Sequence, residues 1–146
     1  MSLSANDKEG ENNMAKSILF VISRPPYKSE NPKLAITHAM ACFVADMHID
    51  EEVEPVVAFV GDGVLNCIKN QRSQEFYGII STEQHIKNQL ASDMRMLVCK
   101  EDLYRLDIKP ERLIDARDMG ADIDLNVVGF NEVQKEMERC DQMMWF

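Results

Sequence analysis

The feature that most limits the fold of this chain is a series of short apolar runs, each followed by a segment with helical spacing. Three runs are rich in β-branched residues and long enough for strands buried on both faces: residues 17–22, 54–60 and 94–99. Shorter runs at 113–115 and 143–146 are expected to add a fourth and a fifth strand. Strands that alternate with helices pair in parallel through right-handed crossovers, which covers both faces of the sheet. The predicted fold is therefore a three-layer, flavodoxin-like α/β domain with a five-stranded parallel sheet in the order 2-1-3-4-5.

The segments between the runs carry the signals of helices. Ser81 is expected to cap one helix, because Gln84 follows at the spacing of a capping box. Asn131 is expected to cap the last helix. The expected helices are residues 33–47, 64–69, 81–92, 100–106 and 131–140.

The chain divides into a polar tail and one domain. Residues 1–14 hold few large apolar side chains and cannot bury enough surface to offset their conformational entropy, so we expect them to be disordered. Residues 15–146 suffice for a single domain. No apolar run approaches the roughly 20 residues that span a bilayer, and the N-terminus lacks the pattern of a secretory signal. We therefore expect a cytoplasmic protein with no membrane partner.

The charge balance argues against nucleic acid as a partner. The chain has 25 acidic and 16 basic residues, which gives a formal net charge of −9, and no basic run offsets it locally. Phosphate backbones would be repelled by such a surface. We therefore expect proteins rather than nucleic acids as partners.

Cys99 is the best-placed of the four cysteines, none of which form a C-x-x-C pair. It ends the third predicted strand, which the proposed order places at the reversal where doubly wound sheets bind ligands. A helix is expected to start directly after it, and the amide groups of a helix start lower the pKa of a thiol. Glu101 and Asp102 oppose that effect. The alternative is a core residue, and a structural role is the default for the others, which are Cys42, Cys67 and Cys140.

Two loops are expected to shape a pocket around Cys99, residues 24–32 and residues 116–124. The residues expected to line this pocket are Ser23, Arg24, Tyr27, Lys100, Met119 and Gly120. The three histidines lack partners at ligand spacing, and no phosphate-loop, dinucleotide or nucleophile-elbow motif is present. We therefore expect neither a metal nor a cofactor.

Four short motifs follow one another in an order that resembles a known family. They are Ser-Arg-Pro-Pro-Tyr at 23–27, Phe-Val-Gly-Asp-Gly-Val at 59–64, Val-Cys at 98–99, and Cys-Asp at 140–141 leading to the terminal Phe146. Together they resemble the DsrE/DsrF sulfur-relay family, including its TusC and TusD members, over roughly residues 16–146. Lys28 departs from the pattern, because many members have glycine there.

The resemblance implies a flavodoxin-like subunit that forms trimers or hexamers, alone or with paralogous subunits. It implies that Cys99 binds sulfane sulfur as a persulfide and passes it to a small carrier protein of the TusA or DsrC type, which is a sulfurtransferase activity. Because some family subunits lack a working cysteine, a non-catalytic assembly subunit with an inert Cys99 stays open. A small-molecule or nucleotide binder is a third reading, which the acidic loop 115–124 and the missing phosphate motifs disfavour.

Overall fold

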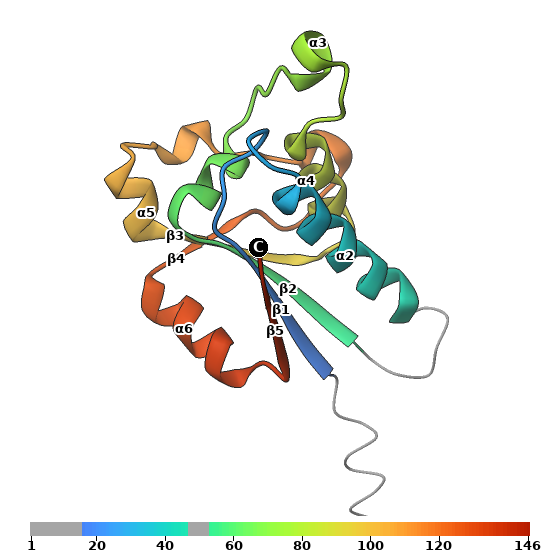
Figure 1. Cartoon of the computed structure of the whole chain (residues 1–146), viewed down its shortest axis with the longest axis vertical. Helices are drawn as coiled ribbons and strands as arrows, with labels where there is room; N and C mark the ends of the chain where they lie inside the picture. Colours follow the sequence, from blue (N-terminus) through green and yellow to red (C-terminus); the bar gives the residue numbers. More distant parts are fainter. Residues whose placement is uncertain (1–15, 47–52) are drawn as a thin grey trace, which may run out of the picture.

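Five parallel strands form the sheet of the computed structural model, which describes residues 16–46 and 53–146. The strands are β1 (Lys16–Ile22), β2 (Val53–Phe59), β3 (Arg95–Cys99), β4 (Asn126–Val128) and β5 (Gln142–Trp145). Their order across the sheet is β4-β3-β2-β1-β5, and each neighbouring pair is parallel (Figure 1). The predicted α/β class and the five-stranded parallel sheet are confirmed.

The predicted strand order, 2-1-3-4-5, is wrong. β2 lies between β1 and β3, and β5 pairs with the other side of β1. Both orders satisfy right-handed crossovers, so the apolar pattern alone does not choose between them. The β1–β2 ladder runs over the full length of both strands, from Lys16 opposite Val53 to Ile22 opposite Phe59. That long, buried pairing is the centre of the sheet.

The predicted fourth strand at 113–115 is also wrong, because residues 126–128 form β4 instead. Leu113 makes an isolated antiparallel bridge with Ile68. The Ile114 amide donates to the carbonyl oxygen of Cys67 at 2.8 Å. This short run therefore packs against the segment that follows β2, and its backbone groups find partners there rather than in the sheet.

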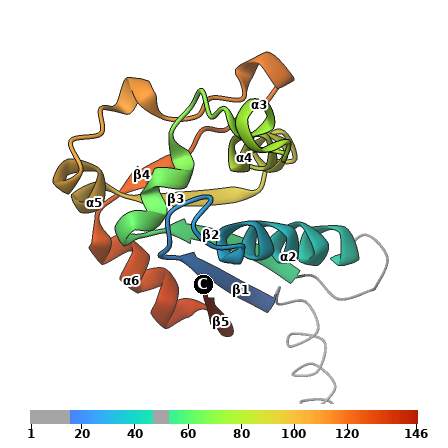
Figure 2. The same cartoon turned by 45° about the horizontal axis from the view of Figure 1, so that its top comes forward.

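Helices cover both faces of the sheet, as predicted. Right-handed crossovers toward β4 put the intervening helices on one face, and the return crossover to β5 puts its helix on the other. In Figures 1 and 2, α2 and α4 accordingly lie on one side of the sheet and α6 on the opposite side. The helices are α2 (Asn31–Asp46), α3 (Ser73–Tyr77), α4 (Thr82–Ala91), α5 (Lys100–Arg105) and α6 (Phe130–Arg139), with 3-10 turns η1 (Gly61–Cys67), η2 (Pro110–Arg112) and η3 (Arg117–Met119). The predicted tail, residues 1–14, lies outside the described residues.

The two predicted helix caps had different outcomes. The Ser81 side chain accepts a hydrogen bond from the Gln84 amide at 3.1 Å, which confirms the first cap. The prediction for Asn131 is wrong, because α6 begins one residue earlier and Gly129 holds the cap position. The amide of Phe130, the first residue of α6, instead donates to Glu101 Oε2 at 2.8 Å. A carboxylate from another helix thus accepts the hydrogen bond of a helix-start amide, which a local capping side chain would otherwise accept.

Tight packing at the carboxyl ends of β1 and β2 fixes the position of η1. A Cβ atom at Gly63 would lie 2.0 Å from the carbonyl oxygen of Ile22, so only glycine allows this approach. The Val60 amide donates to the same carbonyl at 3.0 Å. In the part of the chain that the structure describes, no helix has the length and apolar character needed to cross a membrane.

Candidate functional site

The strand order reverses between β1 and β5 rather than between β1 and β3. The chain moves in one direction from β1 to β4 and then returns to pair β5 with β1. The segment after β3 leads to α5 on the side of α4, whereas the segment after β4 leads to α6 on the other side (Figure 2). Ligands of doubly wound sheets bind beyond the carboxyl ends of the strands at which the strand order reverses. The predicted position of Cys99 at the reversal is therefore wrong, because β2 separates β3 from β1. Cys99, the last residue of β3, lies at the carboxyl edge of the sheet, where the chain leaves β3 and β4 for opposite faces.

The Cys99 thiol lies beneath a carboxylate that joins the starts of two helices. Cys99 precedes α5 directly, and only 1% of its surface is exposed. Its sulfur donates to Glu101 Oε2 at 3.3 Å, and the same oxygen accepts the Phe130 amide at 2.8 Å. Glu101 Oε1 would lie 3.3 Å from a Cβ at Gly129, so the absence of a side chain there leaves room for the carboxylate. Glu101 is itself exposed, which puts the thiol one side chain below the surface.

A second carboxylate fixes α5 against η1. Asp102 Oδ2 accepts the Gly61 amide at 2.6 Å, and Asp102 Oδ1 lies 3.3 Å from Arg105 Nε. The Arg105 guanidinium also reaches Asp62 Oδ1, at 3.2 Å. Arg105, on the same helix as Asp102, is therefore already shared between Asp102 and Asp62.

The surroundings of Cys99 favour the protonated thiol. Burial, the largest cause, and hydrogen bonds to the Asp102 and Glu101 side chains raise the pKa of Cys99 to about 12. The backbone amide of Asp102 acts in the opposite direction, which is the expected effect of a helix start, but it is outweighed. The pKa of Cys99 is therefore raised overall, whereas the helix start alone would lower it.

Both carboxylates are ionised near neutral pH. Hydrogen bonds from its own amide, from the Phe130 amide and from the Cys99 thiol lower the pKa of Glu101. Burial works against ionisation of Asp102, yet hydrogen bonds from the Gly61 amide, the thiol and Arg105 lower its pKa overall. A neutral thiol thus faces two anionic oxygen acceptors.

The predicted pocket residues that follow β1 lie at other contacts. Ser23 Oγ donates to the carbonyl oxygen of Phe146 at 2.9 Å and accepts from Trp145 Nε1 at 3.1 Å. The carbonyl oxygen of Arg24 accepts from Asn66 Nδ2 at 2.9 Å. These contacts hold the loop after β1 against β5 and η1.

Tyr27 lies at a separate hollow. Its backbone has a φ of 69°, its hydroxyl donates to Gln71 Oε1, and its ring packs on Tyr77. It lines a cavity of about 370 Å³ together with Ile79 and Thr82, and Cys99 is not among the lining residues.

The predicted residues of the second loop lie beside α4. Met119 Sδ is 3.9 Å from Gln84 Nε2, and Gly120 closes η3 with a φ of 79°. Lys100 is exposed and adjoins Cys99 along the chain. A shared pocket of all six predicted residues around Cys99 stays a prediction.

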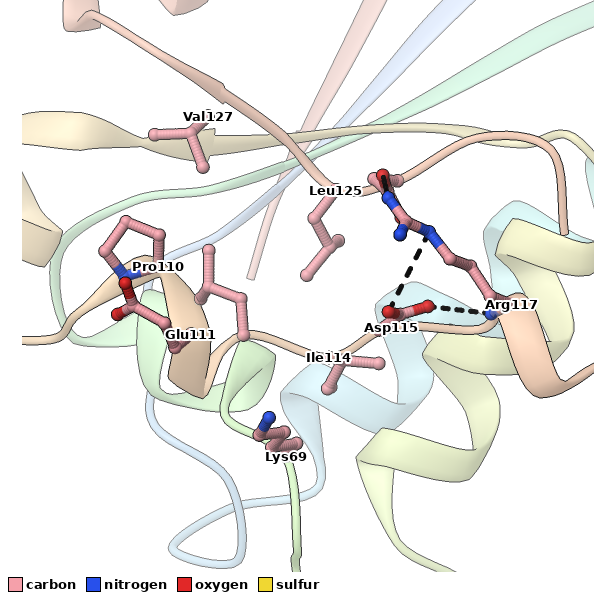
Figure 3. Close-up of a pocket in the computed structure, with 10 residues that line it drawn as sticks. Lys69, Pro110, Glu111, Ile114, Asp115, Arg117, Leu125 and Val127 are labelled. Atoms are coloured by element: carbon pink, nitrogen blue, oxygen red, sulfur yellow. Dashed lines mark hydrogen bonds and ion pairs between the residues drawn. The ribbon is translucent and has the colours of Figure 1, made fainter.

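A hollow of about 430 Å³ lies beside β4 (Figure 3). Leu125, Val127 and Ile114 give it an apolar wall, while Arg117 Nη2 reaches Asp124 at 3.1 Å. Cys99 is not among its lining residues. Because the charge of Arg117 is engaged with neighbouring carboxylates, we assign no ligand to this hollow.

Sequence reasoning missed the partners that define the Cys99 site. Glu101 and Asp102 were expected only to oppose ionisation of the thiol, and nothing local connects them to Gly61 or Phe130. The one signal was the acidic pair, Glu101 and Asp102, which begins two residues after the cysteine. From this acidic pair, a covered and protonated thiol could have been predicted.

Comparison with known proteins identifies the family. A model of the DsrE/DsrF-like family matches residues 16–146, almost the whole chain. The chain therefore belongs to the DsrE/DsrF-like family, which is associated with sulfur relay and whose members often work in complexes. The resemblance seen in the four sequence motifs is confirmed.

Two solved structures show the same fold. The YchN protein from E. coli has a TM-score of 0.74 at 19% identity, covering 91% of this chain and 100% of that one. MTH1491, a protein of unknown function from Methanobacterium thermoautotrophicum, has a TM-score of 0.62 at 15% identity, covering 90% of this chain and 99% of that one. Comparison with curated proteins gives no match. At these identities, the likeness supports the fold alone.

Proposed function

We propose that this chain is a cytoplasmic sulfur-relay subunit in which Cys99 carries sulfane sulfur as a persulfide and passes it to a small carrier of the TusA or DsrC type. The observation that carries the proposal is the place of the Cys99 thiol, at the carboxyl end of β3 beneath the exposed carboxylate of Glu101. Family membership supports the same chemistry. The working form is a homo-oligomer, a trimer or hexamer, or an assembly with paralogous subunits.

The proposed transfer has two balanced steps. The Cys99 thiol loses its proton to solvent, and the thiolate attacks the outer sulfur of a persulfide donor. A new sulfur–sulfur bond forms at Cys99, and the donor leaves as a thiolate. In the second step a carrier thiolate attacks the outer sulfur on Cys99, takes it, and leaves the Cys99 thiolate. No external oxidant or reductant is required.

The resting site is protected rather than activated. With a pKa of about 12, roughly one Cys99 thiol in 10⁵ is ionised at pH 7. Glu101 must move before a donor reaches the sulfur, and its exposed position on the first turn of α5 allows this movement. The low resting reactivity protects the thiol from unspecific oxidation until a donor or carrier arrives.

A second candidate is a non-catalytic assembly subunit with an inert Cys99. The 1% exposure of Cys99 is the observation that favours it. The edge strand β5 exposes Met143, Met144 and Trp145 by 48%, 43% and 58%, and in this reading they lie in contacts between subunits. The same contacts are compatible with a working Cys99.

Peptide mass spectrometry after incubation with inorganic polysulfide separates the two candidates. We expect the peptide that contains Cys99 to gain about 32 Da, which dithiothreitol removes. A Cys99→Ser variant should lose this gain, whereas Cys140→Ser, the matched control at the end of α6, should keep it. A gain that persists on another cysteine in Cys99→Ser while Cys99 of the native protein gains none, even on prolonged incubation with excess polysulfide at high salt, would establish the inert subunit instead.

A further inference from the structure

We propose that Glu101 is a specificity-determining residue, which favours sulfur-bearing partners that carry a cationic group beside the reacting sulfur. The inference rests on the proposed function of Cys99 and names the chemical class of its partners. It concerns access to the thiol and the charge that an incoming sulfur group meets there.

Glu101 occupies the route from solvent to the thiol. Its Oε2 atom bridges the Cys99 sulfur, at 3.3 Å, and the Phe130 amide, at 2.8 Å. The side chain thus spans from α5 to α6 across the carboxyl ends of β3 and β4. A partner that reaches the sulfur must first draw this carboxylate aside, and a cation does so by offering it a replacement partner.

The charges around the thiol are arranged against anionic partners. Glu101 and Asp102 both accept from groups at the site, and Arg105 is already shared between Asp102 and Asp62. An anionic donor therefore approaches a thiolate flanked by two carboxylates. Arg105 is engaged with such carboxylates, and the exposed Lys100 lies close enough to Glu101 to lower its pKa. A unit charge about 5 Å from a carboxylate changes the rate at least about four-fold, and more where water is excluded.

Two exposed aromatic residues are neighbours of Glu101, one along α5 and one through its backbone amide. Tyr104, which is 89% exposed, lies three residues after Glu101 on α5, so the two share one side of the helix. Phe130, which is 44% exposed, carries the amide bound to Glu101. Aromatic faces attract ammonium and guanidinium groups. The rings and the carboxylates thus favour the same kind of partner, a protein segment with Lys or Arg next to its reacting cysteine.

The proposed exchange at the site is balanced. The partner's cation pairs with Glu101, which releases both the thiol and the Phe130 amide. The thiol proton passes to solvent, and the Cys99 thiolate attacks the partner's sulfur–sulfur bond. One sulfur–sulfur bond forms, another breaks, and the leaving group departs as a thiolate.

Three small disulfides of different charge test this preference: cystamine, which is cationic, 2-hydroxyethyl disulfide, which is neutral, and 3,3′-dithiodipropionate, which is anionic. The full chain is incubated with each at neutral pH and low salt, and the mixed disulfide at Cys99 is followed by peptide mass spectrometry. Each rate is divided by the rate of the same disulfide with the urea-unfolded chain, which removes differences in intrinsic reactivity. We expect the normalised rate for cystamine to exceed that for 3,3′-dithiodipropionate at least about four-fold, and less at high salt.

Variants assign the preference to Glu101. Glu101→Gln should reduce the cystamine preference at least about four-fold, whereas Glu101→Asp, which keeps the charge, should retain most of it. Glu138→Gln makes the same substitution at the exposed far end of α6 and should leave the preference unchanged. An unaltered preference in Glu101→Gln would overturn the inference.

The outcomes also separate this inference from the proposed function. If Cys99 gains sulfur from polysulfide yet reacts equally with the three disulfides, only the charge preference is wrong. If Cys99 reacts with none of them and gains no sulfur, the proposed function is wrong, and the inference fails with it.

Discussion

Cys99 and Cys67 are both buried thiols, yet their surroundings differ in kind. Cys67, at the end of η1, is fully buried, and burial alone raises its thiol pKa. Cys99 is 1% exposed, but its sulfur meets the carboxylate of Glu101, an exposed side chain. The comparison teaches that exposed area does not distinguish a core thiol from a covered site. What distinguishes them is whether a polar, movable group lies between the sulfur and water.

The largest expected effect is on stability, and it differs between the two cysteines. Cys67→Ser places a hydroxyl in an apolar core and should lower the free energy of unfolding by about 2 kcal/mol, roughly a 30-fold change in the unfolding equilibrium. Cys99→Ser should lower it by less than about 1 kcal/mol, because a serine hydroxyl can donate to Glu101. Urea unfolding followed by circular dichroism measures both. Equal losses would mean that Cys99 is an ordinary core residue.

A smaller effect is expected from removing the carboxylate that covers Cys99. Glu101→Gln removes the carboxylate whose hydrogen bond with the thiol raises the pKa of Cys99, so the thiolate is less disfavoured. We expect the alkylation of Cys99 by neutral iodoacetamide at pH 8 to become about ten-fold faster, which corresponds to one pKa unit.

Cys67 is the internal control for this measurement, because Glu101 does not contact it and its labelling rate should not change. A slower reaction of Cys99 in the variant would show that Glu101 activates the thiol as a base, which contradicts the role assigned here.

The sequence predicted the features of this molecule that depend on neighbouring residues. The runs that form β1, β2 and β3, the Ser81 cap and the place of Cys99 directly before α5 follow from local patterns of apolar and polar residues. The same patterns led to the correct family. These predictions are confirmed because each feature depends on residues that are close together in the chain.

The features that the sequence did not predict depend on contacts between distant segments. Strand order is set by which ladders form, and the 113–115 run pairs with the segment after η1 instead of joining the sheet. The direction of the Cys99 pKa shift depends on burial and on side chains that the fold orients toward the sulfur. The contact between Glu101 and the Phe130 amide joins residues 29 positions apart, and no local signal marks it.

The most direct test of the central claim, that Cys99 is a covered but reachable thiol, is native-state labelling of all four cysteines with iodoacetamide from pH 7 to pH 10. Since the pKa of Cys99 is about 12, its labelling rate should rise about ten-fold per pH unit without levelling off in this range. We predict that Cys99 labels faster than Cys67 and that low urea concentrations leave its rate unchanged, because only a local movement of Glu101 is needed. If Cys99 and Cys67 label at one common rate that follows global unfolding, the claim is contradicted.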